Sequence, residues 1–559
     1  MDSAYLYLAA SLLPLAIAPW AARLADRSAA ATSGLDSFVA VTVSGVALFH
    51  VLPHTFLEAG LWTLPAMAFG FVLPLGLGHS HSPRRERARS ALILIAFLGL
   101  GLHAALDGLA LFAPHAEPHS GHGAASGSLL ALAVVLHRLP MALAIWWIAA
   151  PSLGPRIAAG LLGTIGVATV GGFVVAGEIW GGLSSPTFAV LQAAIAGMLL
   201  HMVLGHHEHR TAAMEAASAR LASTLGVVAG AGLIAAMTRL HPLEHPLAGE
   251  LSVSAAFRTL AVASAPALLL AYFGLALLRG YAPAGVQRWL LVSRSEPSIL
   301  RRVLTPEIQL PVVALSLCLL GAGVTLYWLL SVLAVGGLAV LTVRPLSPLA
   351  PLSSPPLTPT RERGEISEET PARGRKAGTL RFAFGTEIER TMPWILIGLG
   401  IAAFLEPMTD LAFLLALAKP AQIGVAALLG VLSAFLGPGT APIAAVLIHK
   451  GLGLGPVLVF LLAAVTVGGK RRLAAVFGSR LAWSFAVRMA VLTLIWGYAL
   501  DVPVAVPDLH AMADRPPGVL ALASAFVLLG LTLAALLRQG FRGFLRPSQA
   551  VERWHEAGL

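Results

Sequence analysis

Two histidines and an aspartate stand inside apolar segments of the first half of the chain. The segment LHAALDGLALF holds His103 and Asp107, which are four residues apart and therefore share one face of a helix. The segment VVLHRLPMALAIWW holds His137, followed directly by Arg138. Imidazole and carboxylate groups are ligands that suit zinc and similar divalent metals. His103, Asp107 and His137 therefore predict a metal site, and the alternative is a hydrogen-bonded polar core without metal.

Three further side chains are candidate ligands for the same metal. Glu178 stands near the end of a later apolar segment, and His50 and His54 stand in FHVLPHT. Ionisable groups inside apolar helices are costly and are functional candidates for that reason. The alternatives are an interfacial acid for Glu178 and hydrogen bonds between helices for the two histidines.

A second constellation lies in the last third of the chain, around a run rich in glycine and proline. Residues 421–451 read AQIGVAALLGVLSAFLGPGTAPIAAVLIHKG, with the break formed by Gly437, Pro438, Gly439 and Pro442. Two half-length helices around such a break predict a re-entrant hairpin, an arrangement from which transporters build substrate sites. A proline-kinked full span and two short crossings are the alternatives.

Polar residues near this hairpin predict a substrate path. Glu406 and Asp410 are four residues apart on one helical face, and Lys450 follows the second half-helix. Two carboxylates could relay protons or attract a cation, whereas the alternative is a hydrated helix end. The predicted path comprises Glu406, Asp410, Lys450 and the four residues of the break.

The elements that must position these residues are membrane helices. The 559 residues are 57% hydrophobic and only 11% charged, whereas a soluble domain has about 25% charged residues. Apolar runs long enough to span a bilayer recur along nearly the whole chain. We expect an all-α polytopic membrane protein with about 15 transmembrane helices plus the re-entrant hairpin. Residues 1–20 lack a basic start and a cleavage site, so they predict the first span rather than a signal peptide.

The apolar runs divide the chain into four predicted parts: three membrane parts and one linker. The spans are expected near 4–22, 36–57, 61–78, 90–113, 128–150, 157–179, 187–206, 221–238, 259–279, 307–324, 326–343, 392–416, 453–469, 481–500 and 517–537. They divide into an eight-helix module at 1–242, the first part of a second module at 243–343, and its second part at 391–559. Residues 344–390 between them predict a disordered cytoplasmic linker with an amphipathic segment, because the stretch is rich in proline and charge.

Basic residues indicate the orientation in the membrane. Alternate loops carry nearly all of them, and the opposite loops hold only Arg239, Arg258, Lys419 and Arg515. By the positive-inside rule, the N-terminus lies outside and the C-terminus in the cytoplasm of an inner-type cell membrane. The formal charge of +10 thus reflects topology, so membrane lipid is an expected partner and nucleic acid is not.

The first module resembles the ZIP family of divalent metal transporters. HAALDGLA (103–110) is similar to the family motif H-N-x-x-[DE]-G, HRLPMALA (137–144) to H-x-x-P-[EH], and FHVLPHT (49–55) to H-x-L-P-E. The resemblance implies eight spans and a zinc-type site. Only His103, Asp107 and His137 carry over, because Ala104, Arg138 and Met141 replace expected polar or ligating residues. A fixed Arg138 beside Asp107 could take the place of the metal, so a working and a lost metal site both stay open.

The second module resembles ArsP-type predicted permeases. The resemblance rests on TMPWILIGLGIAAFLEPM (391–408) and GPGTAPIAAVLIHKGLGLGPVLVFLLAAVTVG (437–468), including Pro442, Ala444, Lys450 and Gly451. It implies a permease, with a weak repeat of the same pattern at 259–343. The family usually has cysteines before the glycine of the turn, where this chain has Leu436-Gly437-Pro438. A soft metalloid would therefore lack thiol ligands at this turn.

Together these features predict a transporter of a metal ion, such as a zinc-like divalent cation, or of a metalloid. Transport would proceed by alternating access, since the chain has no Walker A loop for ATP hydrolysis. We expect no enzyme activity, no required cofactor beyond a bound divalent metal such as zinc, and a small inorganic ion as substrate; a homodimer is an open alternative to a monomer. The competing hypothesis is a non-transporting metal sensor or accessory membrane protein with degenerate sites. A lone cysteine, Cys318, excludes a disulfide within the chain.

Overall fold

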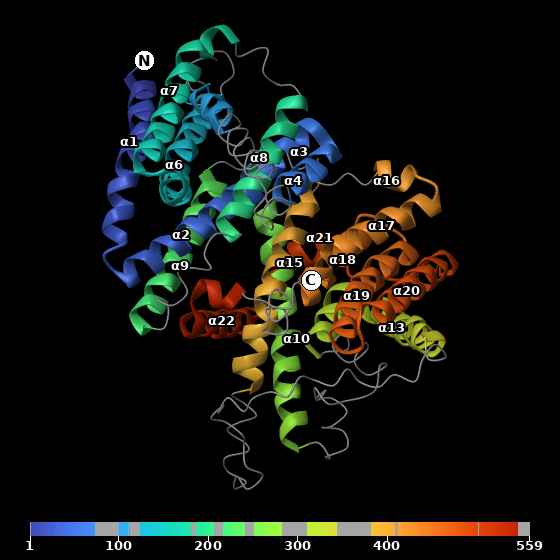
Figure 1. Ribbon diagram of the computed structural model, residues 1–559. Coiled ribbons are helices and arrows are strands. Elements are labelled where there is room, and N and C mark those ends of the chain that lie inside the picture. The colour runs from blue at the N-terminus through green and yellow to red at the C-terminus, as the bar shows by residue number, and fades with distance from the viewer. Residues whose placement is uncertain are drawn as a thin grey trace. The chain divides into compact units, whose positions relative to one another are not determined.

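The computed structural model describes residues 2–72, 100–109, 111, 123–179, 186–205, 216–240, 251–281, 310–343, 382–408, 412–500 and 502–545. Every regular element in these ranges is a helix (Figure 1). Twelve of the described helices are long and apolar enough to cross a membrane. The predicted fold class, a polytopic helical membrane protein, is therefore confirmed.

The chain divides into two compact units. The first unit comprises Met1–His245 with Leu536–Arg546, and the second comprises Pro246–Ala535 with Pro547–Leu559. The described helices of the first unit are α1 (Asp2–Ala25), α2 (Ala29–Val46), η1 (Ala47–Val51), α3 (Leu52–Ala59), η2 (Gly60–Trp62), α4 (Thr63–Val72), α6 (Gly123–Leu153), α7 (Pro155–Ile179), α8 (Pro186–Gly205) and α9 (Ala217–Leu240), with a further helical segment at 100–109.

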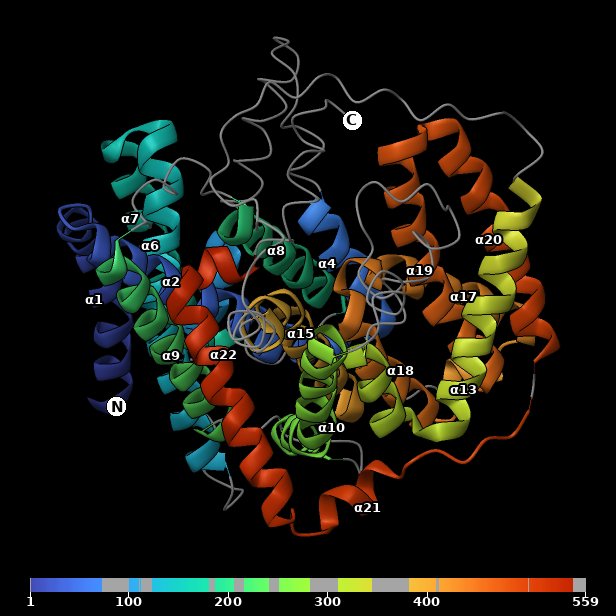
Figure 2. The same ribbon diagram turned by 90° about the horizontal axis from the view of Figure 1, so that it is seen from below.

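The second unit is built around α15 and α19. Its described helices are α10 (Val253–Tyr281), α13 (Leu310–Val343), η8 (Phe382–Glu387), α15 (Ile388–Met408), α16 (Ala412–Ala416), α17 (Lys419–Ser433), η9 (Ala434–Gly439), α18 (Thr440–His449), α19 (Leu454–Phe477), α20 (Ser479–Ala499), α21 (Leu509–Asp514) and most of α22 (Val519–Leu545). Figures 1 and 2 both show α17, α18, α19 and α20 grouped together, and α19 packs against the other three.

Small residues bring neighbouring helices into backbone contact. In the pair α2 and α9, a Cβ added to Gly226 would overlap the carbonyl oxygen of Gly34. In the pair α4 and α8, a Cβ on Gly197 would overlap the carbonyl oxygen of Met67. Helices in a membrane associate through such close packing, because lipid tails give them no hydrophobic drive to pair.

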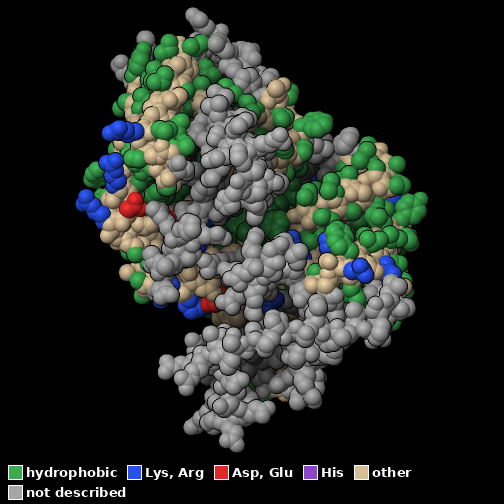
Figure 3. All heavy atoms as spheres, in the orientation of Figure 1, with side chains coloured by type: hydrophobic (Ala, Val, Ile, Leu, Met, Phe, Trp, Pro, Cys, Tyr) green, Lys and Arg blue, Asp and Glu red, His purple; other side chains and the backbone are tan. Residues whose placement is uncertain are grey.

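The outer surface of the described helices is largely apolar. Exposed side chains include Val174 on α7, Leu270 on α10, and Leu520 and Phe526 on α22, each at least 70% exposed. Figure 3 shows hydrophobic side chains over much of the visible surface of the described residues. In water this surface would drive aggregation, whereas in a bilayer it faces lipid.

Helix α13 differs from the two spans predicted at 307–324 and 326–343. Its break lies at Gly321, which has a left-handed φ of 82° that glycine adopts readily. The arm before the break, residues 310–320, is about 16 Å long at 1.5 Å per residue. The described part of this arm therefore covers about half of a 30 Å hydrocarbon core, and residues 282–309 before it lie outside the described residues. The apolar run continues through Gly321, which is why hydropathy alone misplaced the boundary.

The Gly/Pro break predicted within 421–451 is present. Helices α17 and α18 are joined by η9, in which Gly437 has a φ of 50° and a ψ of −108°. The two arms have different neighbours, because α17 packs along α19 and α18 packs against α15 and α13. Of the predicted linker, residues 344–381 lie outside the described residues, and residues 382–390 belong to η8 and the start of α15.

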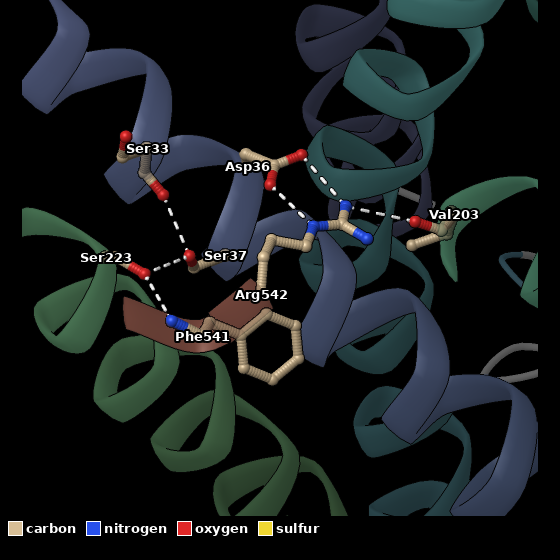
Figure 4. A network of polar contacts seen from close by, with 7 residues as sticks. All are labelled: Ser33, Asp36, Ser37, Val203, Ser223, Phe541 and Arg542. Atoms are coloured by element: carbon tan, nitrogen blue, oxygen red, sulfur yellow. Dashed lines mark hydrogen bonds and ion pairs between the residues drawn. The ribbon is translucent and has the colours of Figure 1, made fainter. Parts of the chain in front are cut away.

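The end of α22 is attached to the first unit by polar contacts (Figure 4). After a second break at Gly540, the Arg542 guanidinium forms two hydrogen bonds of 3.0 and 3.1 Å to the Asp36 carboxylate and donates to the carbonyl oxygen of Val203. The backbone N–H of Phe541 donates to the Ser223 hydroxyl, which contacts Ser37 at 2.7 Å. This arrangement fixes the end of α22 on α2, α8 and α9.

Changing Arg542 to glutamine should lower the free energy of unfolding of the first unit by about 1.5 to 3 kcal/mol, the range for hydrogen bonds to charged groups. The side chains of Arg542 and Asp36 are 13% and 12% exposed, so the remaining carboxylate would stay poorly solvated. A double-mutant cycle with Asp36→Asn, measured by equilibrium unfolding in detergent, checks the pairing. Strictly additive losses would contradict it.

Candidate functional site

His103, Asp107 and His137, the three predicted ligands, lie together in the first unit. The Asp107 Oδ2 atom is 3.8 Å from His103 Nε2 and 3.5 Å from His137 Nε2. One ligand atom from each residue can be chosen so that all three lie within 4.8 Å of one another. Asp107 and His137 are buried and His103 is partly buried. The geometry therefore brings together a donor set that can hold a divalent cation.

Arg138 contacts Oδ2 of Asp107, the same carboxylate oxygen that faces the two histidines. Its Nη2 atom is 3.1 Å from Asp107 Oδ2 and donates a 2.9 Å hydrogen bond to Thr169 Oγ1 on α7. The Arg138 side chain is completely buried. A guanidinium keeps its charge in proteins and pairs closely with carboxylates. Arg138 thus supplies Asp107 with a fixed positive charge, as the sequence hypothesis required.

The helical segment 100–109 is positioned by glycines. A Cβ on Gly108 would overlap the carbonyl oxygen of Thr169, and a Cβ on Gly172 would overlap that of Ala105. Backbone contact of this kind fixes the distance between the segment and α7. It therefore holds Asp107 within reach of Arg138.

Changing Gly172 to valine should destabilise the first unit by about 1 to 3 kcal/mol, the usual cost of overpacking. Any side chain there must push α7 away from Ala105. The matched control is Gly171→Val on the same helix, because a Cβ on Gly171 meets open space. Thermal unfolding in detergent, followed by size-exclusion chromatography, compares the two. Equal melting of the two variants would contradict the close contact.

A cavity of about 40 Å³ adjoins the two histidines. His103 and His137 contribute to its wall, together with Met141 and Gln192. A cavity that holds a water needs about 10 to 15 Å³, so this one accommodates a water or a small ion. Met141 stands where the ZIP motif expects a ligand, and it gives the wall an apolar thioether instead.

The other predicted ligands of the first unit are placed only as backbone. Glu178 belongs to the last turn of α7, His50 to η1 and His54 to α3. Their side chains lie outside the described part of the structure. Whether they join the His103 group therefore stays a prediction.

Glu406 and Lys450 of the predicted substrate path meet in the second unit. The Glu406 carboxylate is completely buried near the end of α15, and its Oε1 atom is 3.9 Å from Lys450 Nζ. Lys450 follows the last residue of α18, so the break between α17 and α18 determines where its ammonium lies. Asp410, the fourth-neighbour carboxylate, lies outside the described residues.

Two histidines that the sequence reasoning missed complete this group. His449 Nε2 and His510 Nε2 lie 3.6 and 3.9 Å from Glu406 Oε1. His449 ends α18 and immediately precedes Lys450, so its proximity to that residue was a usable signal. His510 belongs to the short helix α21, about 100 residues after Glu406 in the sequence. Spacing within one segment cannot predict a contact between residues so far apart in the sequence.

Close backbone packing positions the break between α17 and α18 against α15. A Cβ on Gly398 of α15 would overlap Gly439, and a Cβ on Gly439 would overlap the carbonyl oxygen of Trp394. The predicted residues Gly437, Pro438 and Gly439 thus lie in η9, which packs on α15, and Pro442 is buried in the first turn of α18. The start of α15 is held by α10, where the Tyr272 hydroxyl contacts Thr391 Oγ1 at 2.6 Å.

Comparison with known proteins adds one finding. A family model described as a predicted permease, ArsP_1, matches residues 185–502. The match includes most of the second unit and the end of the first, and it supports the ArsP-type part of the predicted resemblance. No curated protein and no solved structure matches the chain.

Proposed function

The chain belongs to the ArsP_1 family of predicted permeases, and from this premise we propose that it carries a zinc-like divalent cation across the membrane by alternating access. The observation that carries the proposal is the broken helix pair of the second unit. Helices α17 and α18 meet at Gly437, next to α15, whose Glu406 is buried. Broken helices with a buried charged group are the form in which secondary transporters build their substrate sites.

The available ligands favour a divalent cation over a soft metalloid. The turn before Gly437 has no thiol, and the one cysteine of the chain, Cys318 on α13, donates a hydrogen bond to the carbonyl oxygen of Ala263. Carboxylate and imidazole are the groups gathered at the other end of α18, where His449 meets Glu406 and His510. Such ligands suit zinc and its neighbours, whereas thiolates suit softer ions.

The proposed setting is the inner cell membrane, with the N-terminus outside and the C-terminus in the cytoplasm. This orientation rests on the loops that hold almost all of the arginines and lysines. It places the end of α15 that holds Glu406 toward the outer face. Transport would draw on ion gradients, because the sequence has no ATP-binding loop.

The Arg138–Asp107 ion pair favours a second candidate function for the first unit alone. Under this alternative the unit is an accessory module whose ZIP-like site has exchanged its metal for a guanidinium. The 3.1 Å contact and the complete burial of Arg138 are the observations behind it. A chain without any transport would extend this alternative to the whole protein, as a metal-sensing or accessory membrane protein.

Zinc uptake into vesicles tests the proposed function. The purified full-length chain is reconstituted into liposomes that enclose a fluorescent zinc indicator, without ATP. We expect saturable uptake above that of protein-free liposomes, competed by other divalent cations and not by arsenite. Uptake no faster than in protein-free liposomes, from chain shown to be monodisperse and inserted, would contradict the proposal and favour the accessory role.

A further inference from the structure

We propose that Glu406, His449 and His510 form a three-ligand binding site for a divalent transition metal of the zinc type in the second unit. The three residues come from α15, α18 and α21, and one ligand atom of each can be chosen so that all lie within 4.8 Å of one another. The inference is that these three residues bind the metal. Only the further statement, that the transported cation enters the protein at this site, rests on the proposed function.

The distances suit a small adjustment to tetrahedral coordination. Zinc–nitrogen and zinc–oxygen bonds of about 2.0 to 2.2 Å put tetrahedral ligand atoms about 3.3 to 3.6 Å apart. Glu406 Oε1 lies 3.6 Å from His449 Nε2 and 3.9 Å from His510 Nε2. The two imidazoles also contact each other, because His449 Nε2 lies 3.0 Å from His510 Nδ1. A bound metal would replace this contact with a bond to each ring.

The exposed fraction of the three ligand side chains decreases from His510 through His449 to Glu406. The side chains of His510, His449 and Glu406 are 34%, 16% and 0% exposed, respectively. A cation can therefore reach the most accessible imidazole first and the buried carboxylate last. Two neutral imidazoles and one carboxylate also leave a fourth coordination position for water, as in zinc sites that exchange ligands.

Local structure holds each ligand in place. His449 is the last residue of α18, where the partial negative charge of a helix C-terminus favours a cation. Asp508 caps α21, since its carboxylate accepts hydrogen bonds from the backbone N–H groups of His510 and Ala511. Helix α21 packs against α10.

Lys450 gives the site a competing positive charge. Its ammonium is 3.9 Å from Glu406 Oε1 and its side chain is only 8% exposed. In the absence of metal this charge offsets the buried carboxylate. When a divalent cation binds, Lys450 must turn away or be repelled by it. Lys450→Met should therefore tighten metal binding, whereas loss of a ligand should weaken it.

Metal binding to the purified full-length chain tests the site. The chain is stripped with a chelator, and zinc is titrated against a chromogenic competitor; cobalt is then used to record the visible bands of a tetrahedral site. We expect about one tight zinc per chain. Glu406→Gln, His449→Ala and His510→Ala should each weaken it more than the roughly 100-fold that an outer-shell change can cost. Lys450→Met should strengthen it and keep the cobalt bands.

Matched variants separate this site from others. Glu389→Gln lies at the opposite end of α15, and His201→Gln lies on α8 against Phe71; both should bind zinc as the wild type does. His103→Ala should also leave this binding unchanged. Zinc that survives Glu406→Gln, or that is lost in His103→Ala, would overturn the assignment. If the chain binds no zinc but still takes it up into vesicles, the site is overturned and the proposed permease function stands. If the chain binds zinc at this site but takes none up, the proposed function is overturned and the site stands.

Discussion

Replacing Arg138 with methionine should destabilise the first unit by about 3 to 5 kcal/mol, the cost of breaking a buried ion pair from one side. The variant leaves the Asp107 carboxylate buried with only two imidazoles near it. Methionine fills much of the space of the arginine stem, so lost volume contributes little. Equilibrium unfolding in detergent measures the change, and Arg156→Met, an exposed arginine at the start of α7, is the control.

The same variant should gain zinc. With the guanidinium gone, a cation is the group that can best offset Asp107, and His103 and His137 are positioned as its further ligands. We expect Arg138→Met to melt at higher temperature when zinc is added and to bind one zinc more than the wild type does. This gain should vanish in Arg138→Met combined with His103→Ala. A wild-type zinc that is lost in His103→Ala would show instead that the ion pair has not replaced the metal.

Replacing Gly439 with valine should abolish transport. Gly439 is the last residue of η9, directly before α18, and its backbone contacts Trp394 and Gly398 of α15. A valine side chain must push the break away from α15, at a cost of about 1 to 3 kcal/mol. The push also moves α18, and with it Lys450 and His449, relative to Glu406. We expect zinc uptake to fall to that of protein-free liposomes.

A second glycine of the same broken helix provides the control for this variant. A Cβ on Gly424 of α17 meets open space, so Gly424→Val should be inserted and transport at close to the wild-type rate. Both variants are compared at equal amounts of reconstituted chain. Normal uptake by Gly439→Val would mean that the contact between α15 and the break plays no part in transport.

The sequence predicted well those features that depend on local pattern. Long apolar runs predicted the membrane helices, because a helix needs about 20 such residues to span a bilayer. The four-residue spacing of His103 and Asp107 predicted one shared face, and the glycines and prolines at 437–442 predicted the break. The hypothesis that Arg138 could supply Asp107 with a positive charge came from its place directly after His137, and its Nη2 atom lies 3.1 Å from Asp107 Oδ2.

Features that depend on the packing of distant segments escaped prediction. His510 meets Glu406 only because α21 packs on α10, and its own surroundings in the sequence carry no repeat or motif. The Arg542–Asp36 pair joins residues at opposite ends of the chain. The break at Gly321 was missed for another reason, since glycine is common in membrane helices and only the tertiary structure shows which one adopts a positive φ.

The most direct test of the proposed permease is zinc uptake by Glu406→Gln beside Glu389→Gln. The two variants make the same chemical change at opposite ends of α15, one at a completely buried carboxylate and one in the first turn. Both are reconstituted in equal amounts into liposomes that contain the zinc indicator. We predict wild-type uptake for Glu389→Gln and only the protein-free rate for Glu406→Gln. Equal uptake by the two variants would contradict a cation path through the second unit at Glu406.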